Sequence, residues 1–176
     1  AAVGDAASRL ACEARRLRSG NGVEGARAVG PVVSASQLER VHSFIPIAEK
    51  EGATVAAGGH VSTEGALGKG FFHEPTVLID VKPNMRVAQE EIFGPVAAAI
   101  EVDGLGEALS VANDSIYGLA ASVWTRDLSV AHKTVRALEA GVTGANCFAH
   151  VYLPHPFGSP PQSGPASATS LGARAS

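Results

Sequence analysis

The chain has 176 residues, of which 45% are hydrophobic, and this is enough for one domain with a core but not clearly enough for two. With a formal net charge of −3, the composition gives no reason to expect binding to nucleic acid or to an anionic membrane. Two cysteines are too few for a disulfide scaffold and suit a cytoplasmic protein, and no apolar run is long enough to span a membrane.

A first helix is predicted over residues 8–18, where Leu10, Ala14 and Leu17 recur at helical spacing and arginines occupy the other faces. Cys12 lies in the middle of this helix among small apolar residues. A reactive thiolate prefers a helix N-terminus or a neighbouring histidine. We therefore expect Cys12 to pack rather than to act as a nucleophile.

A second helix is predicted over residues 34–51. It begins with Ser34 and Gln37 at the spacing of a capping box, and Gly52 ends it. Its apolar stripe consists of Leu38, Val41, Ile45 and Ala48. Pro46 falls inside this pattern, where it removes one helical hydrogen bond and should kink the helix.

Short strands alternate with helices in the rest of the chain. Strands are predicted at residues 54–57, 76–79, 96–102, 119–125 and 142–146, and helices at residues 106–112 and 128–138, the latter capped by Asp127. The alternation predicts an α/β fold over residues 1–159, with a mostly parallel sheet flanked by helices. Residues 160–176 are rich in Pro, Ser and Ala, and we expect them to form a disordered tail.

Two kinds of short motif carry little functional signal. Residues 20–25 spell G-x-G-x-x-G, but they follow a helix rather than a strand, so a turn is a better interpretation than a dinucleotide-binding loop. The six histidines do not show the spacing of a metalloprotease, and neither cysteine belongs to a CxxC motif. We therefore expect no metal site.

The most informative feature is the acidic pair Glu90-Glu91, which runs through Ile92-Phe93-Gly94-Pro95 into an apolar strand. A carboxylate at the entrance to a strand is well placed to accept hydrogen bonds from a sugar diol, and Phe93 could cover a planar ring. The alternative is a carboxylate at the end of a helix that is merely exposed. Composition alone does not decide between the two.

Four ordered motifs resemble the NAD(P)-dependent aldehyde dehydrogenase superfamily. They are GFFHEPTV at residues 70–77, EEIFGPV at 90–96, ANDSIYGLAA at 112–121 and WTRD at 124–127. The resemblance covers roughly residues 8–164 and corresponds to the C-terminal part of the family's catalytic domain. It implies a Rossmann-like α/β assembly that oxidises an aldehyde to a carboxylic acid with NAD or NADP. In that chemistry a cysteine thiolate attacks the carbonyl carbon, and a glutamate activates water to hydrolyse the thioester.

The resemblance also assigns residues to sites. Glu91 matches the glutamate that binds the nicotinamide ribose and Phe93 the aromatic beside the nicotinamide, while Gln37 and Arg40 match helix positions on the ribose side. The family usually has lysine where this chain has Arg40. The substrate-side matches are Asn146, Ala149, His150, Val151 and Phe157.

Other family features are not matched. The nucleophilic cysteine and the general-base glutamate are expected upstream of Ala1, so the isolated chain is predicted to be inactive. The family is homo-oligomeric, but the arm that pairs its subunits is not visible in residues 165–176. The competing hypothesis is a non-catalytic module that pairs with a full-length subunit or binds a ligand.

Overall fold

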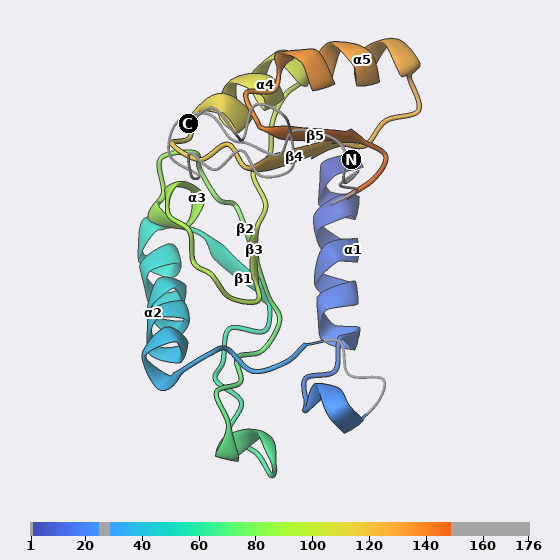
Figure 1. Cartoon of the computed structure of the whole chain (residues 1–176). Coiled ribbons are helices and arrows are strands. Elements are labelled where there is room, and N and C mark those ends of the chain that lie inside the picture. The colour runs from blue at the N-terminus through green and yellow to red at the C-terminus, as the bar shows by residue number, and fades with distance from the viewer. Residues whose placement is uncertain (1, 25–28, 149–176) are drawn as a thin grey trace, which may run out of the picture. The chain divides into compact units, whose positions relative to one another are not determined.

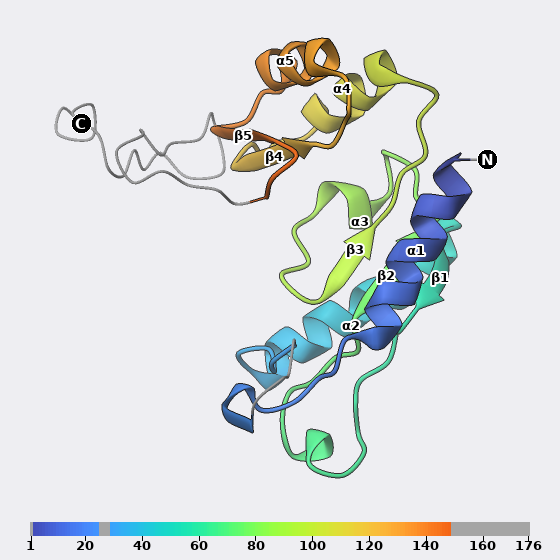
Figure 2. The ribbon, with the colours of Figure 1, turned by 90° about the vertical axis from the view of Figure 1, so that its right-hand side faces the viewer.

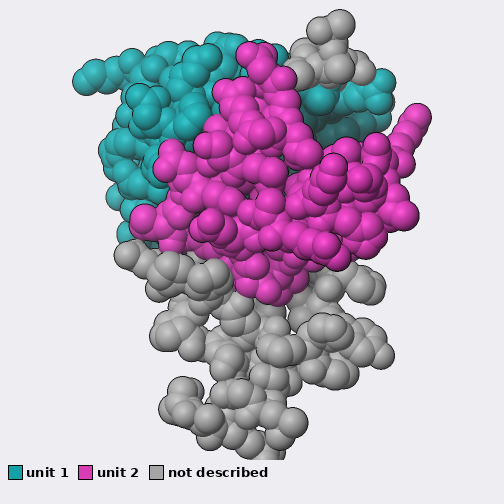
Figure 3. Space-filling view, turned by 90° about the horizontal axis from the view of Figure 1, so that it is seen from above, with its two compact units in different colours: residues 1–101 teal, residues 102–176 magenta. Residues whose placement is uncertain are grey.

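The computed structural model describes residues 2–24 and 29–148. The chain divides into two compact units, residues 1–101 and residues 102–176, which Figure 3 colours separately. The predicted boundary between residues 159 and 160 lies outside the described residues. Among the helices of the described residues, none is long and apolar enough to cross a bilayer.

The first unit is a three-stranded sheet with a helix on each face (Figures 1 and 2). Its strands β1 (Thr54–Ala57), β2 (Thr76–Ile79) and β3 (Val96–Ala98) lie in the order β1-β2-β3. Neighbouring residues of β2 face opposite sides, as the pleat requires. Val77 packs with helix α1 (Ala2–Arg16), and Leu78 packs with helix α2 (Ala35–Glu51).

One strand pair differs from the prediction. β2 and β3 are parallel, as expected, but β1 and β2 are antiparallel. The connection between β1 and β2 contains only the short 3₁₀ helix η2 (Leu67–Lys69), with an antiparallel bridge between Val61 and His73. Parallel pairing needs a longer crossover, usually a helix, so this connection returns the chain as an antiparallel pair.

Helix α2 forms as the sequence predicted. Ser34 is its N-cap, with the side-chain oxygen accepting a hydrogen bond from the Gln37 backbone N–H, and Gly52 ends it in the left-handed conformation (φ 106°). Its buried face consists of Val41, Phe44, Ile45 and Ala48. Pro46 lies inside the helix at an exposed position.

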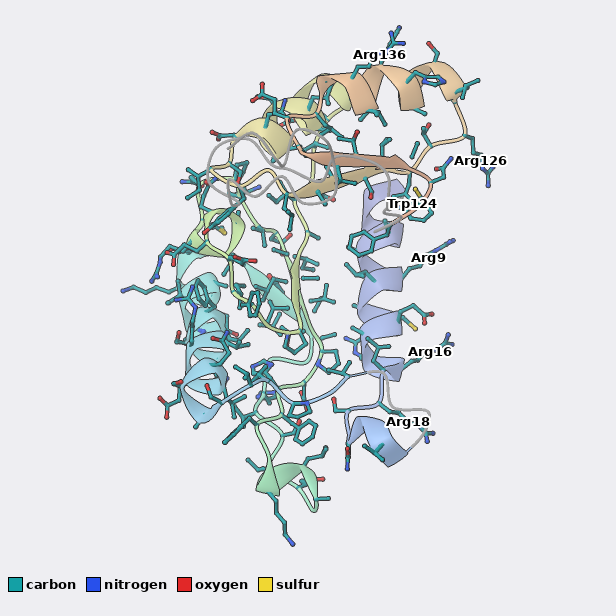
Figure 4. All side chains as sticks on the ribbon, in the orientation of Figure 1. Arg9, Arg16, Arg18, Trp124, Arg126 and Arg136 are labelled. Atoms are coloured by element: carbon teal, nitrogen blue, oxygen red, sulfur yellow. The ribbon has the colours of Figure 1, made fainter. Side chains whose placement is uncertain are left out.

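Helix α1 forms over Ala2–Arg16, but Ala14 is the one residue of the predicted apolar stripe that is buried. Ala11 and Ala14 pack against the sheet, whereas Leu10 and Leu17 remain 43% and 46% exposed. The small alanine side chains allow the helix to lie close to the strands. Cys12 is exposed, so the prediction that it packs is wrong. Figure 4 shows Arg9 and Arg16 projecting away from the sheet, as expected, whereas the Arg15 guanidinium donates to the carbonyl oxygen of Ala56 in β1.

After α1 the chain turns through the 3₁₀ helix η1 (Gly22–Glu24), and the backbone N–H of Gly20 donates to the carbonyl of Val29. The part of the G-x-G-x-x-G spelling that the structure describes is therefore a turn after a helix. No strand precedes it among residues 2–24, so the geometry of a dinucleotide loop is not present there.

The second unit is a parallel pair of strands covered by helices. Its described elements are α4 (Leu105–Asn113), β4 (Ala120–Val123), α5 (Leu128–Ala137) and β5 (Val142–Ala145). The Asp127 carboxylate caps α5 by accepting hydrogen bonds from the backbone N–H groups of Ser129 (2.7 Å) and Val130 (3.0 Å). Figure 1 places α4 and α5 on the same side of this sheet. The predicted α/β class is thus confirmed in both units.

Candidate functional site

The candidate site is the turn of residues 90–95, which joins the short helix α3 (Arg86–Gln89) to β3. Ile92 is buried and packs in the core with Val41 and Phe44 of α2. Glu91 and Phe93, on either side of Ile92, are both exposed, and the Phe93 side chain is 72% accessible. The buried isoleucine therefore anchors a turn that presents a carboxylate and an aromatic ring to solvent.

The two adjacent carboxylates are not equivalent. The Arg86 guanidinium donates two hydrogen bonds to Glu90, at 2.6 Å to Oε1 and 3.1 Å to Oε2. These hydrogen bonds lower the pKa of Glu90, so that carboxylate stays ionised and paired. Within the described part of the chain, the Glu91 carboxylate makes no hydrogen bond or ion pair. Glu91 is therefore the carboxylate available to a ligand.

Gln37 and Arg40 reach this turn from α2. The Gln37 amide nitrogen donates to the carbonyl oxygens of Ile92 (3.1 Å) and Phe93 (3.0 Å). An Arg40 guanidinium nitrogen donates to the carbonyl oxygen of Glu91 (2.9 Å). The structure thus brings together all four residues that the resemblance assigns to cofactor binding.

Gly94 has a role in this site that sequence reasoning missed. A Cβ atom at this position would lie 2.5 Å from Cγ2 and 2.8 Å from Cγ1 of Val41, so only glycine lets the turn approach α2 this closely. Phe93, the residue before it, has a left-handed backbone conformation (φ 59°). The signal in the sequence was a glycine between an aromatic residue and a proline just before a strand.

The predicted substrate-side residues belong to the second unit. Asn146 follows β5 with φ 54°, and its side-chain amide binds the backbone of Thr125 twice. Its Oδ1 accepts from the Thr125 N–H, and its Nδ2 donates to the Thr125 carbonyl, both at 2.9 Å. Asn146 thereby links the chain after β5 to the chain after β4. Ala149, His150, Val151 and Phe157 lie outside the described residues.

Two of the three histidines of the first unit, His42 and His73, have neighbouring rings. The His73 side chain is 1% exposed, and its ring lies 5.6 Å from that of His42. The Nδ1 atom of His73 is 2.9 Å from the carbonyl oxygen of Glu74, while its Nε2 atom has no partner. Burial lowers the pKa of His73, which favours the neutral ring.

Comparison with known proteins adds the family context. A sequence model of the Aldehyde dehydrogenase family matches residues 2–172. Betaine aldehyde dehydrogenase of Mesorhizobium japonicum is 41% identical over 167 residues, which cover 95% of this chain and 34% of that protein. Betaine aldehyde dehydrogenase of Brucella melitensis is 42% identical over 156 residues, which cover 89% of this chain and 32% of that protein.

Solved structures agree with these matches. An aldehyde dehydrogenase mutant from Bacillus cereus superposes with a TM-score of 0.90 at 38% identity, over 97% of this chain and 34% of that one. Betaine aldehyde dehydrogenase of Staphylococcus aureus in complex with NAD+ gives a TM-score of 0.83 at 35% identity, over 85% of this chain and 30% of that one. The chain spans about a third of the length of these relatives. It belongs to the aldehyde dehydrogenase family.

Proposed function

We propose that this chain supplies the nicotinamide-riboside contacts of an NAD(P)-dependent aldehyde dehydrogenase, which oxidises an aldehyde to a carboxylic acid. The observation that carries the proposal is the turn of residues 90–95. It leaves the Glu91 carboxylate unpaired and the Phe93 ring exposed, while the neighbouring Glu90 is occupied by Arg86. The NAD+ complexes of structurally similar aldehyde dehydrogenases support it.

The two exposed side chains suit the two halves of a nicotinamide riboside. An ionised carboxylate is a pure acceptor with two oxygens, so Glu91 can accept hydrogen bonds from the adjacent hydroxyl groups of the ribose. The Phe93 ring offers an apolar surface against which a flat aromatic ring can pack. Bound there, the cofactor would accept the hydride that leaves the substrate carbon during oxidation. The residues of this chain bind and orient it.

We further propose that the substrate side is formed by Asn146 and by Ala149, His150, Val151 and Phe157. In the family resemblance, these five residues match the positions that contact the substrate. Relatives that are 41–42% identical to this chain are betaine aldehyde dehydrogenases, which supports a small aldehyde as substrate. The cysteine count of two supports a cytoplasmic location. The homo-oligomeric assembly implied by the family stays a prediction.

Titration of the ¹⁵N-labelled chain with NAD+ tests the cofactor assignment. We expect the amide resonances of Glu91, Ile92 and Phe93 to shift with ligand concentration, because the cofactor would lie against this turn. Helix α5, which contains none of the assigned cofactor residues, gives an internal reference, and its resonances should stay in place. If the resonances of the turn do not respond at any concentration of NAD+, the assignment is wrong.

A further inference from the structure

The backbone of the candidate turn is held in an unusual conformation. Phe93 has φ 59°, in the left-handed region that residues with a Cβ atom rarely adopt. Such a conformation persists only where the surrounding structure imposes it. Because the Phe93 ring is 72% exposed, packing of the ring contributes little to holding the turn. Burial of Ile92 anchors the middle of the turn, and hydrogen bonds to the backbone of the turn supply a further restraint.

Those contacts come from two side chains on the first turns of α2. Gln37 uses its amide nitrogen for the carbonyl oxygens of two successive residues, Ile92 and Phe93. Arg40 donates to the carbonyl oxygen of the residue before them, Glu91. Three consecutive carbonyl groups of the turn are thus bound from one helix.

The two donor side chains are themselves well supported. The Ser34 side chain caps α2 by accepting a hydrogen bond from the Gln37 backbone N–H. This fixes the helix backbone at the residue from which the Gln37 side chain extends. The Arg40 guanidinium carbon lies 5.3 Å from the centroid of the buried Phe44 ring, a cation–π contact that orients the donor. A planar guanidinium can stack and donate at once, which a lysine ammonium does not do in the same way.

We propose that Gln37 and Arg40 are positioning residues, which hold the turn of residues 91–93 so that the Glu91 carboxylate and the Phe93 ring are presented to the nicotinamide riboside. The inference rests on the proposed function for the identity of the ligand. This role adds to the cofactor binding that the resemblance assigns to these residues, because the Gln37 amide nitrogen and one Arg40 guanidinium nitrogen donate to the backbone of the turn. The effect on the cofactor passes through the turn.

The variant Gln37→Glu isolates this role. It keeps the size of the side chain but replaces the amide nitrogen, which donates both hydrogen bonds, with an oxygen that faces carbonyl oxygens. The two hydrogen bonds to Ile92 and Phe93 are therefore lost. Glutamate is equally suited to this position in a capping box, so α2 itself should remain intact. The matched control is Ala35→Glu, which adds the same charge to the same exposed helix turn without touching residues 91–93.

Two measurements on the full chain read out the result. Backbone ¹⁵N order parameters at Ile92 and Phe93 should be about 0.85 in the wild type and below about 0.6 in Gln37→Glu. The dissociation constant of nicotinamide mononucleotide should rise by about tenfold in the same variant, since two hydrogen bonds that hold the site are lost. Ala35→Glu should match the wild type in both. Arg40→Lys, which keeps the charge, should loosen the turn to a smaller extent.

The outcomes separate the two claims. If the turn stays as rigid in Gln37→Glu as in Ala35→Glu, the claim that Gln37 holds the turn is wrong. A turn that loosens without any change in the affinity for nicotinamide mononucleotide overturns the positioning role. A wild-type chain that does not bind nicotinamide mononucleotide overturns the proposed function itself, whatever the order parameters show. If Gln37→Glu loses its helical circular dichroism, Arg40→Lys compared with the wild type gives the same test without changing a capping-box residue.

Discussion

At the scale of single residues, the structure distinguishes side chains that look alike in the sequence. Glu90 and Glu91 are adjacent and chemically identical, yet only Glu90 is in reach of Arg86, four residues earlier. The ion pair follows helical spacing, which the sequence did contain. The exposure of Glu91 could not be predicted in the same way, because it depends on how Ile92 is buried against α2.

His73 carries a prediction about pH. Its ring is buried next to His42 and near Glu74 and His60, and burial lowers its pKa below the usual value of 6.5. As the pH falls through 6.5, the unfolded chain takes up a proton at His73 before the folded chain does. The free energy of unfolding should therefore decrease as the pH falls from 7 towards 5.

The variant His73→Gln checks this by urea denaturation at several pH values. It should have a shallower dependence of the free energy of unfolding on pH than the wild type, even if it is less stable throughout. His132→Gln, at an exposed position on α5, should keep the wild-type slope. Equal slopes for His73→Gln and the wild type would show that His73 is not the group responsible.

At the scale of elements, local sequence signals predicted well where a helix begins and ends. They did not predict how the elements contact one another. α2 was predicted within a residue at its start and at its end, because the signals at Ser34 and Gly52 are local. The buried face of α1 was predicted only in part, because the close approach of the sheet favours the small side chains of Ala11 and Ala14 over that of Leu10. The antiparallel pairing of β1 with β2 was missed because the connecting segment, not the strand pattern, decides the direction.

The close contact between the turn and α2 makes a prediction at this scale. Gly94→Ala would place a methyl group 2.5 Å from a Val41 methyl, so we expect it to destabilise the chain by about 1–3 kcal/mol. Val41→Ala in the same chain should recover part of that loss, and a double-mutant cycle from thermal denaturation measures the coupling. Strictly additive effects would mean that the two residues are not in contact.

At the scale of the whole molecule, the order of several motifs along the chain indicated the family where any single motif was ambiguous. That order supported the resemblance over residues 8–164, and the family match extends over residues 2–172. The fold class followed from the same sequence pattern. The predicted substrate-side residues Ala149, His150, Val151 and Phe157 lie outside the described residues. Asn146 is described, and its side-chain amide makes two hydrogen bonds with the backbone of Thr125.

The central claim is that Glu91, and not Glu90, binds the nicotinamide ribose, and the matched variants Glu91→Gln and Glu90→Gln test it most directly. Isothermal titration with NAD+ should show a dissociation constant raised roughly tenfold to a hundredfold in Glu91→Gln, as expected when a hydrogen bond to a charged group is weakened. Glu90→Gln should bind NAD+ with the same affinity as the wild type, because the Glu90 carboxylate is hydrogen-bonded to Arg86. An unchanged affinity in Glu91→Gln, or an equal loss in both variants, would contradict the account.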